Sequence, residues 1–229
     1  METSVVIAVR NGERFLGKAI DSVLAQISET DELIVVDDGS TDDSAKIAAT
    51  SGDGRVKLIG LGRSGVSAAR NQGLAAATGR FLAFLDHDDL WPPGRHRMLI
   101  EALYRNPSAG SAYGRIRVIE EVDAPKPGLW SHLDAQHMES NICSALYRTE
   151  CVRGSGGFSE AMLLGEDTDL QLRLMRLGLN PMRCDGDSLI YRRHGSNATN
   201  DIAAVNRALI AVARRVSEAK QTYNRKGGV

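Results

Sequence analysis

The segment Gly79-Arg80-Phe81-Leu82-Ala83-Phe84-Leu85-Asp86-His87-Asp88-Asp89-Leu90-Trp91 joins an apolar run to a cluster of acids. Residues 81–85 show no polar alternation, which is typical of a strand buried on both faces of a parallel sheet. The acids that follow would lie beyond the carboxyl end of that strand, where open parallel sheets bind ligands. Such an oxygen-rich cluster suits Mg²⁺ or Mn²⁺ carrying a diphosphate. The alternative is an acidic N-cap for a helix after Pro92 and Pro93.

The composition indicates an ordinary globular protein. The chain has 229 residues, of which 42% are hydrophobic and 25% charged, and its formal net charge is -1. This balance gives no general attraction to nucleic acid, so we expect no nucleic-acid partner. Three cysteines without CxxC spacing, no signal-like N-terminus and no stretch of membrane-span length predict a cytoplasmic protein with reduced thiols.

Strand-like and helix-like segments alternate along the first half of the chain, which is typical of an α/β fold with a mostly parallel sheet. The expected strands are residues 4–9, 33–36, 56–61 and 81–85. The expected helices between and after them span about 15–27, 45–49, 66–77 and 95–104. In the second half we expect strands at 112–119, 142–147 and 189–191, and helices at 170–177 and 202–216. Residues 120–127 are charged and contain prolines, which indicates an exposed loop.

A second strand also ends in acids. Asp37 and Asp38 follow residues 33–36, and capping of the next helix by Ser40, Thr41 or Asp42 leaves them unexplained. Residues 60–65 are glycine-rich, but they lack the lysine and the spacing of a phosphate-binding P-loop.

The ordered set of motifs resembles the family-two glycosyltransferases. The motifs are Val5 to Asn11, Ile34 to Asp42, Gly65 to Gly73, the acidic strand end, Gly165-Glu166-Asp167 and Tyr191-Arg192-Arg193-His194. The resemblance implies the GT-A fold, a Rossmann-like α/β domain with a mostly parallel central sheet flanked by helices. It also implies an inverting transferase that moves a sugar from a nucleotide-sugar, expected to be a UDP-sugar, to an acceptor hydroxyl in polysaccharide or glycoconjugate synthesis.

Site residues follow from the resemblance position by position. Those that match nucleotide-sugar contacts are Ala8, Arg10, Asp38, Arg70, Asp86, His87 and Asp88. Asp167 matches the catalytic base, with Glu166 beside it on the acceptor side, while Asp88 and His194 match ligands of Mn²⁺ or Mg²⁺. The family usually has Pro at the position of Ala8 and Tyr at that of Arg10, so the nucleotide stays open.

Glycosyl transfer needs positive charge at the leaving diphosphate and a base at the acceptor hydroxyl. The metal at Asp88 would supply the first, assisted by His194 or by Arg192 and Arg193, and Asp167 would supply the second. The structural alternatives are a helix N-terminus that favours acids at 166–167 and a hydrogen-bonded structural histidine at 194.

Two other functions compete with the transferase. A haloacid-dehalogenase-type phosphatase would need an aspartate nucleophile where the chain has Val36. A catalytically weak nucleotide-sugar binding protein would have lost the base or the metal acid, and both are retained here.

The expected organisation is a GT-A domain at 1–200, with its nucleotide-sugar half at about 1–110 and its acceptor half at about 111–200. Residues 201–229 form a C-terminal amphipathic helix and tail. The acceptor, a saccharide, a lipid-linked sugar or another hydroxyl compound, would contact 120–141. The helix carries an apolar seam at Ile202, Val205, Leu209, Val212 and Val216, with Arg207, Arg214, Arg215 and Lys220 around it. The seam predicts a homodimer contact; the alternatives are local packing and peripheral attachment to the inner membrane face.

Overall fold

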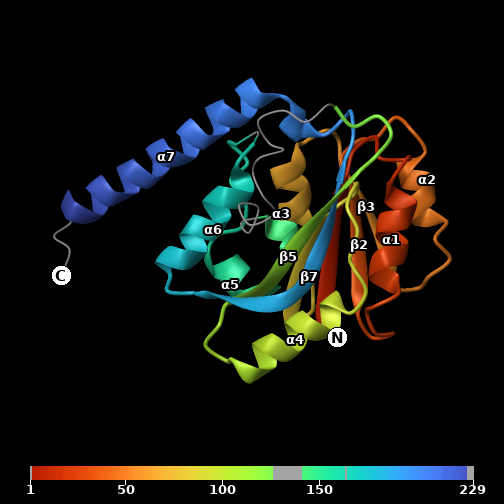
Figure 1. The fold of residues 1–229 in the computed structure, drawn as a ribbon, viewed down its shortest axis with the longest axis horizontal. Coiled ribbons are helices and arrows are strands. Elements are labelled where there is room, and N and C mark those ends of the chain that lie inside the picture. Colours follow the sequence, from red (N-terminus) through yellow and green to blue (C-terminus); the bar gives the residue numbers. More distant parts are fainter. Residues whose placement is uncertain (1, 126–140, 163, 226–229) are drawn as a thin grey trace.

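The computed structural model describes residues 2–125, 141–162 and 164–225, with the side chains of residue 209 and of 216–225 outside the description. These residues form a mixed α/β fold around one sheet (Figure 1). The strands are β1 (Thr3–Val9), β2 (Glu32–Asp37), β3 (Val56–Gly60), β4 (Phe81–Asp86), β5 (Ser111–Glu120), β6 (Ala145–Arg148) and β7 (Pro181–Arg193). The helices are α1 (Leu16–Leu24), α2 (Ser44–Ala49), α3 (Val66–Ala76), α4 (Arg95–Arg105), α5 (Thr149–Gly154), α6 (Glu166–Arg176) and α7 (Ile202–Arg225), with 3₁₀ turns η3 (Ile142–Ser144) and η4 (Ala198–Asn200).

The strand order is β3-β2-β1-β4-β6-β5-β7. β3, β2, β1 and β4 are parallel, β6 runs antiparallel to both of its neighbours, and β5 and β7 pair in parallel. The expected α/β fold with a mostly parallel central sheet is therefore confirmed.

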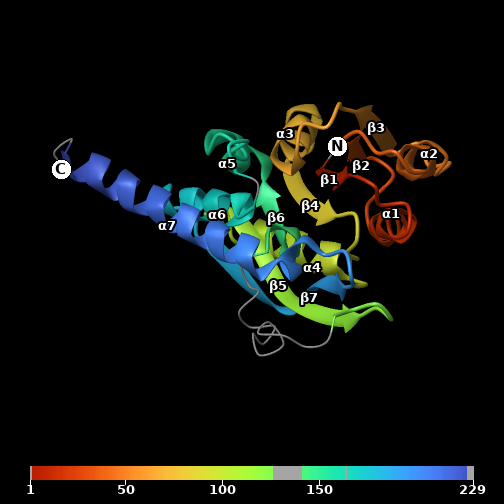
Figure 2. The ribbon, with the colours of Figure 1, turned by 90° about the horizontal axis from the view of Figure 1, so that it is seen from above.

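Helices cover both faces of the sheet. The Trp91 amide, ahead of α4, donates to Ser22 of α1, and the His96 amide of α4 donates to Gln26, just after α1. Arg153 of α5 instead donates to carbonyls at the end of α3. Figure 2 accordingly shows α1 and α4 on one side of the sheet, with α3 and α5 on the other. Close packing of α3 on β1 requires Gly73, because a Cβ there would lie 2.3 Å from Cγ1 of Val6.

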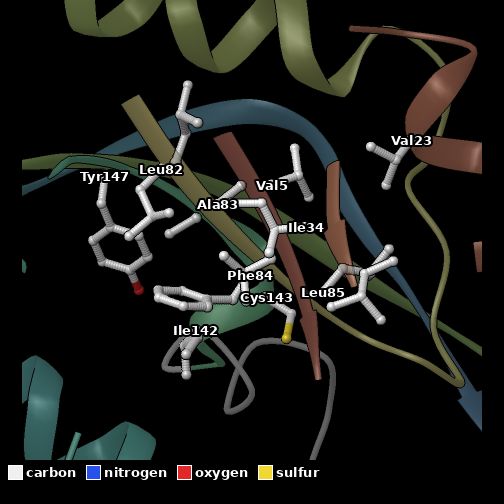
Figure 3. Packing of buried hydrophobic residues seen from close by; sticks show 14 of the residues in the cluster. Val5, Val23, Ile34, Leu82, Ala83, Phe84, Leu85, Ile142, Cys143 and Tyr147 are labelled. Atoms are coloured by element: carbon white, nitrogen blue, oxygen red, sulfur yellow. The ribbon is translucent and has the colours of Figure 1, made fainter. Parts of the chain in front are cut away.

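The core explains why the central strands carry no polar alternation. Residues 81–85 are buried, as are all residues of β1 and β2. In Figure 3, Phe84 points toward Tyr147 and Ile142, and Leu85 points away from them. The Phe84 ring meets Phe158 edge-on with ring centroids 5.0 Å apart. Both faces of β4 are thus covered, and the acids after Leu85 lie at the carboxyl end of this buried strand.

Several expected boundaries were wrong. β7 spans thirteen residues instead of residues 189–191, and residues 142–144 form η3 instead of a strand. α6 begins at Glu166, before the expected residue 170, and α5 was not predicted. The N-cap position of α2 is Asp43, although Asp42 still accepts from the Ser44 amide at 3.0 Å. The C-terminal helix is capped by Asp201, whose Oδ1 accepts from the Ala204 amide at 2.9 Å.

Candidate active site

Several of the predicted donor-side residues lie together at the carboxyl ends of β1, β2 and β4. Ala8 pairs with Asp86 across β1 and β4, and Val9 pairs with Asp37 across β1 and β2. The acids after β4 do not cap α4, because that helix begins at Arg95 with Gly94 in the N-cap position. The capping alternative for this acidic cluster is therefore wrong.

Asp37 and Asp38 order the loops beside this edge. Oδ1 of Asp37 accepts from the Ser40 amide at 3.1 Å. The two carboxylate oxygens of Asp38 accept from the amides of Ser64 and Gly65, the latter at 2.8 Å. Asp38 thus fixes the glycine-rich loop after β3, and Arg10 lies exposed at the end of β1. A contact from Asp38 or Arg10 to a nucleotide base stays a prediction.

Arg70 of α3 connects the acidic end of β4 to the start of α6. Its Nη2 donates to Oδ1 of Asp86 and its Nη1 to Oε1 of Glu166, each at 2.6 Å. The guanidinium also lies 5.5 Å from the centroid of the Phe158 ring. The structure therefore places Arg70 as a buried bridge between two acids that are 80 residues apart in sequence, a partner set that the sequence did not reveal.

The bridge sets the protonation of its members. Burial alone would raise the pKa of Asp86, but the Arg70 charge and hydrogen bond outweigh burial and hold the pKa of Asp86 below its usual value. The two carboxylates raise the pKa of Arg70 despite its burial. Burial dominates at Glu166 and raises the pKa of that carboxyl in spite of Arg70. Oε2 of Glu166 is buried and has no hydrogen-bond partner among the described residues.

Asp167 lies in the first turn of α6, next to this bridge. Burial raises the pKa of Asp167, and the hydrogen bond from the Thr168 amide, at 2.6 Å, opposes that shift. A carboxylate with a raised pKa is better matched to accepting a proton near neutral pH. Glu166 and Asp167 lie in the first turn of α6, as the helix N-terminus alternative expected, and the charges of Arg70 and Asp86 act on the pKa of Asp167. The role of Asp167 as the catalytic base stays a prediction.

Asp88 and His194 are in direct contact, and their role as metal ligands stays a prediction. His194 Nε2 lies 3.0 Å from Oδ2 of Asp88. The histidine ring packs on Phe15, with ring centroids 4.4 Å apart, and its Nδ1 lies 2.9 Å from the hydroxyl of Ser196. His87 packs on Gly12, where a Cβ would lie 2.3 Å from its Cδ2.

Asn197 was missed by sequence reasoning although it touches both of these residues. Its Oδ1 accepts from the His194 amide at 2.6 Å, and its Nδ2 lies 3.4 Å from Oδ2 of Asp88. The same Nδ2 donates to the Arg192 carbonyl at 3.2 Å. The available signal was its place three residues after His194, within a short turn that follows the last strand.

Arg192 has a structural place different from the expected diphosphate contact. It is 2% exposed, its guanidinium donates to the carbonyls of Asp88 and Phe15, and its amide donates to Oδ1 of Asp89 at 2.9 Å. Arg193 pairs with Glu120 at 3.0 Å. The contacts of Arg192 join the acidic loop after β4 to the end of β7, and the Arg193–Glu120 pair joins β7 to β5.

The acidic cluster fits a divalent ion. Carboxylate oxygens of Asp86, Asp88 and Asp89 lie within 4.8 Å of one another, and hard oxygen ligands of this kind suit Mg²⁺ or Mn²⁺. Asp89 is fully buried, and burial beside the two other acids raises its pKa well above the usual value. Asp88, half-buried and next to His194, is therefore the better outward-facing ligand.

Comparisons with known proteins agree with this geometry. The family model described as Glycosyl transferase family 2 matches residues 4–159. The succinoglycan biosynthesis protein ExoU of Rhizobium meliloti (strain 1021) is 29% identical over 98% of this chain and 74% of its own length. The Escherichia coli UDP-Glc:alpha-D-GlcNAc-diphosphoundecaprenol beta-1,3-glucosyltransferase WfgD is 35% identical over 51% of this chain. This chain spans 46% of the length of WfgD and 43% of that of an uncharacterized Nostoc glycosyltransferase, alr2836, which is 35% identical over 56% of this chain.

Solved structures show the same fold. The S. aureus TarS 1–349 structure in complex with UDP-GlcNAc superposes with a TM-score of 0.69 at 19% identity, over 88% of this chain and 61% of that chain. The family match covers most of the sequence, from the first strand to the residue after Phe158. The chain belongs to glycosyltransferase family 2 and has its GT-A-type fold.

Proposed function

We propose that this protein transfers a sugar from a UDP-sugar to an acceptor hydroxyl with inversion at the anomeric carbon, in the synthesis of a polysaccharide or glycoconjugate. The observation that carries the proposal is the Asp86–Arg70–Glu166 bridge. It holds the donor-side acid Asp86 next to the acidic pair of α6, at the carboxyl end of β4. Family membership and the succinoglycan relative support the reaction class.

On the donor side, Ala8, Arg10 and Asp38 line the place for the nucleotide, and Asp86 and His87 the place for the ribose. Asp88 with His194 would hold Mn²⁺ or Mg²⁺. When bound there, such an ion supplies Lewis-acid stabilisation of the charge that develops on the leaving diphosphate. Asp88, His194 and Asn197 are already joined by hydrogen bonds, so these side chains are oriented before a ligand arrives.

On the acceptor side, Asp167 takes the proton from the acceptor hydroxyl as its oxygen forms the new bond to the anomeric carbon. The nucleoside diphosphate leaves from the opposite face in the same displacement, which inverts the configuration. A placed general base contributes about 10²- to 10⁴-fold to such a step. Glu166, held by Arg70, keeps the first turn of α6 next to the donor acids.

The acceptor itself is a saccharide, a lipid-linked sugar or another hydroxyl compound. The name of WfgD describes an acceptor on a diphosphoundecaprenol carrier, so we favour a lipid-linked sugar reached from the cytoplasmic membrane face. No helix within the described residues is long and apolar enough to cross a membrane. Most of the region from which acceptor contacts were expected, residues 126–140 of 120–141, lies outside the described residues.

The test is a panel of nucleotide-sugars assayed for hydrolysis and transfer with Mn²⁺, with Mg²⁺ and with a chelator. We expect metal-dependent turnover of one UDP-sugar and loss of turnover in Asp167→Asn. Tight binding of UDP with no turnover of any donor would favour the binding protein. Hydrolysis of simple phosphate esters would favour the phosphatase, against which stands the fully buried Val36 at the position of its nucleophile.

A further inference from the structure

Helix α7 lies beyond the region that matches the family, and it runs alongside α6, which carries the acidic pair. Both views show the two helices next to each other (Figures 1 and 2). The matched region ends at residue 159, and α7 begins at Ile202. The contacts between α7 and the start of α6 are specific to a few residues.

The first contact is a close approach at Gly165, directly before Glu166. Gly165 has φ +81°, a conformation that favours glycine, and a Cβ there would lie 3.1 Å from Cγ2 of Val212 and 3.5 Å from Cβ of Ala208. Val212 is 5% exposed. The backbone that leads into the acidic pair therefore lies in van der Waals contact with α7.

The second contact is an ion-pair network. Arg215 of α7 has its Nε 3.5 Å from Oδ1 of Asp169, and its Nη1 donates to the Ser159 hydroxyl at 2.8 Å. Asp169 also accepts from Nε of Arg173 at 2.9 Å. The other two nitrogens of Arg173 donate to the carbonyls of Ser155 and Gly157 at 2.6 Å. One network thus joins α7, α6 and residues 155–159.

That network also contacts the helix that carries Arg70, the centre of the Asp86–Arg70–Glu166 bridge. Asn71 of α3, next to Arg70, accepts from the Phe158 amide at 2.8 Å and donates to the Phe158 carbonyl at 2.9 Å. The ring of Phe158 lies under the Arg70 guanidinium. Residues 155–159 are therefore held by α3 on one side and by α6 and α7 on the other, around the arginine that binds Glu166.

We infer that α7 is a positioning element for Asp167, with Val212 and Arg215 as the positioning residues. The inference rests on the proposed function of Asp167. A general base acts only within hydrogen-bond reach of the proton that it abstracts, and a misplacement of about 1 Å costs about 100-fold in rate. Val212 fixes the position of Gly165 and Arg215 fixes that of Asp169, so the first turn of α6 is held on both sides of Asp167.

These contacts also bear on whether the apolar seam of α7 serves a homodimer, local packing or membrane attachment. Val212, a seam residue, packs on the chain's own domain. Leu209 and Val216 have side chains outside the described set. Local packing is therefore the use of the seam at Val212, and the basic residue Arg215 belongs to the same contact.

The test compares Arg215→Ala and Val212→Ala with a matched control, Arg214→Ala. Arg214 is the exposed neighbour of Arg215 on the same helix. In the full-length protein we expect the two test variants to lower the kcat for transfer by about tenfold or more. The donor KM and the UDP affinity measured by calorimetry should stay within about twofold of wild type, because no hydrogen bond or ion pair among the described residues joins a donor-side residue to α7. Arg215→Lys should restore part of the kcat, and the control should match wild type.

A readout that does not need turnover separates this inference from the proposed function. Hydrogen exchange of the amides of residues 166–170 should be faster in both test variants and unchanged in the control. If no nucleotide-sugar is turned over by wild type, the proposed function fails and exchange alone decides whether α7 holds this turn. Unchanged exchange, or a kcat equal to that of the control, would overturn the inference. A parallel fall of kcat, UDP affinity and thermal stability would also overturn it, because it would indicate general destabilisation.

Discussion

Replacing Arg70 by methionine removes the charge that two buried acids share, and the stability loss can be worked from the contacts. Breaking a buried ion pair by removing one partner costs about 3–5 kcal/mol. The side chains of Arg70 and Glu166 are 7% and 9% exposed, whereas that of Asp86 is 33% exposed and can regain water. We therefore expect a loss near the upper single-pair figure, about 5 kcal/mol, and not twice that amount. The total stability of domains of this kind is about 5–15 kcal/mol. A loss of about 5 kcal/mol would therefore unfold a protein at the lower end of that range and leave one at the upper end folded.

The pH dependence has a definite sign. In wild type the lowered pKa of Asp86 contributes stability above its unfolded pKa, and that contribution is lost as the pH falls through the folded pKa. Without Arg70 the pKa values of both acids rise, so the folded variant binds protons that the unfolded chain does not. Its stability then increases as the pH falls from 7.5 toward 5, and the difference from wild type narrows.

Urea unfolding followed by circular dichroism, in metal-free buffer at the two pH values, measures both effects. Arg70→Lys keeps the charge and provides a second variant if Arg70→Met does not fold. Arg105→Met removes an exposed pair with Glu101 and should cost no more than about 0.5 kcal/mol. A loss below about 1 kcal/mol at pH 7.5 for Arg70→Met, or a difference that widens at pH 5, would refute the reasoning.

Four further outcomes are expected. Asp88→Ala should abolish metal-dependent UDP binding by calorimetry; equal UDP affinity of wild type with and without chelator would remove the metal from the donor site. Asp167→Asn should keep UDP affinity and lower kcat by about 10²- to 10⁴-fold, and full activity would exclude Asp167 as the base. Asn197→Ala should weaken Mn²⁺ binding, followed by electron paramagnetic resonance, by about 10- to 100-fold, because Asn197 orients Asp88; unchanged Mn²⁺ affinity would make it structural only. The exposed Ile202 and Ile210 on α7 still allow a homodimer, which light scattering at micromolar concentration tests; a monomer there ends that idea.

The central sheet was readable from the sequence because its strands are buried on both faces. Uninterrupted apolar runs such as Phe81 to Leu85 have no other simple explanation, and the glycines and acids after them mark their ends. β7 was underestimated because its first half alternates exposed and half-buried residues, among them Arg183, Asp185 and Asp187, on a ribbon paired with β5. Only the buried stretch 188–190 carries a signal that resembles the other strands.

Within the site, individual acids were easier to find than their partners. Asp86 and Asp88 stand at a strand end, a position that sequence can identify. Arg70 was matched to a nucleotide-sugar contact but its acidic partners were not predicted, because they lie 16 and 96 residues away and their proximity depends on the whole sheet. Asn197 had only its place three residues after His194 as a signal, since an amide in a turn gains its role only when β7 brings it to Asp88.

The place of β1 in the sheet has a consequence for the order in which contacts can form during synthesis. β1 pairs with β2 and β4, and β2 with β3, so a four-stranded parallel layer can form once the chain up to Asp86 has left the ribosome. The hydrogen bonds of the fully buried Arg95 form later, because its guanidinium donates to the carbonyls of Cys143, Ala145 and Ser188. In the nascent chain, Asp86 and Arg70 are therefore synthesised before Glu166, so the Asp86–Arg70–Glu166 bridge can form only after residue 166 has been translated.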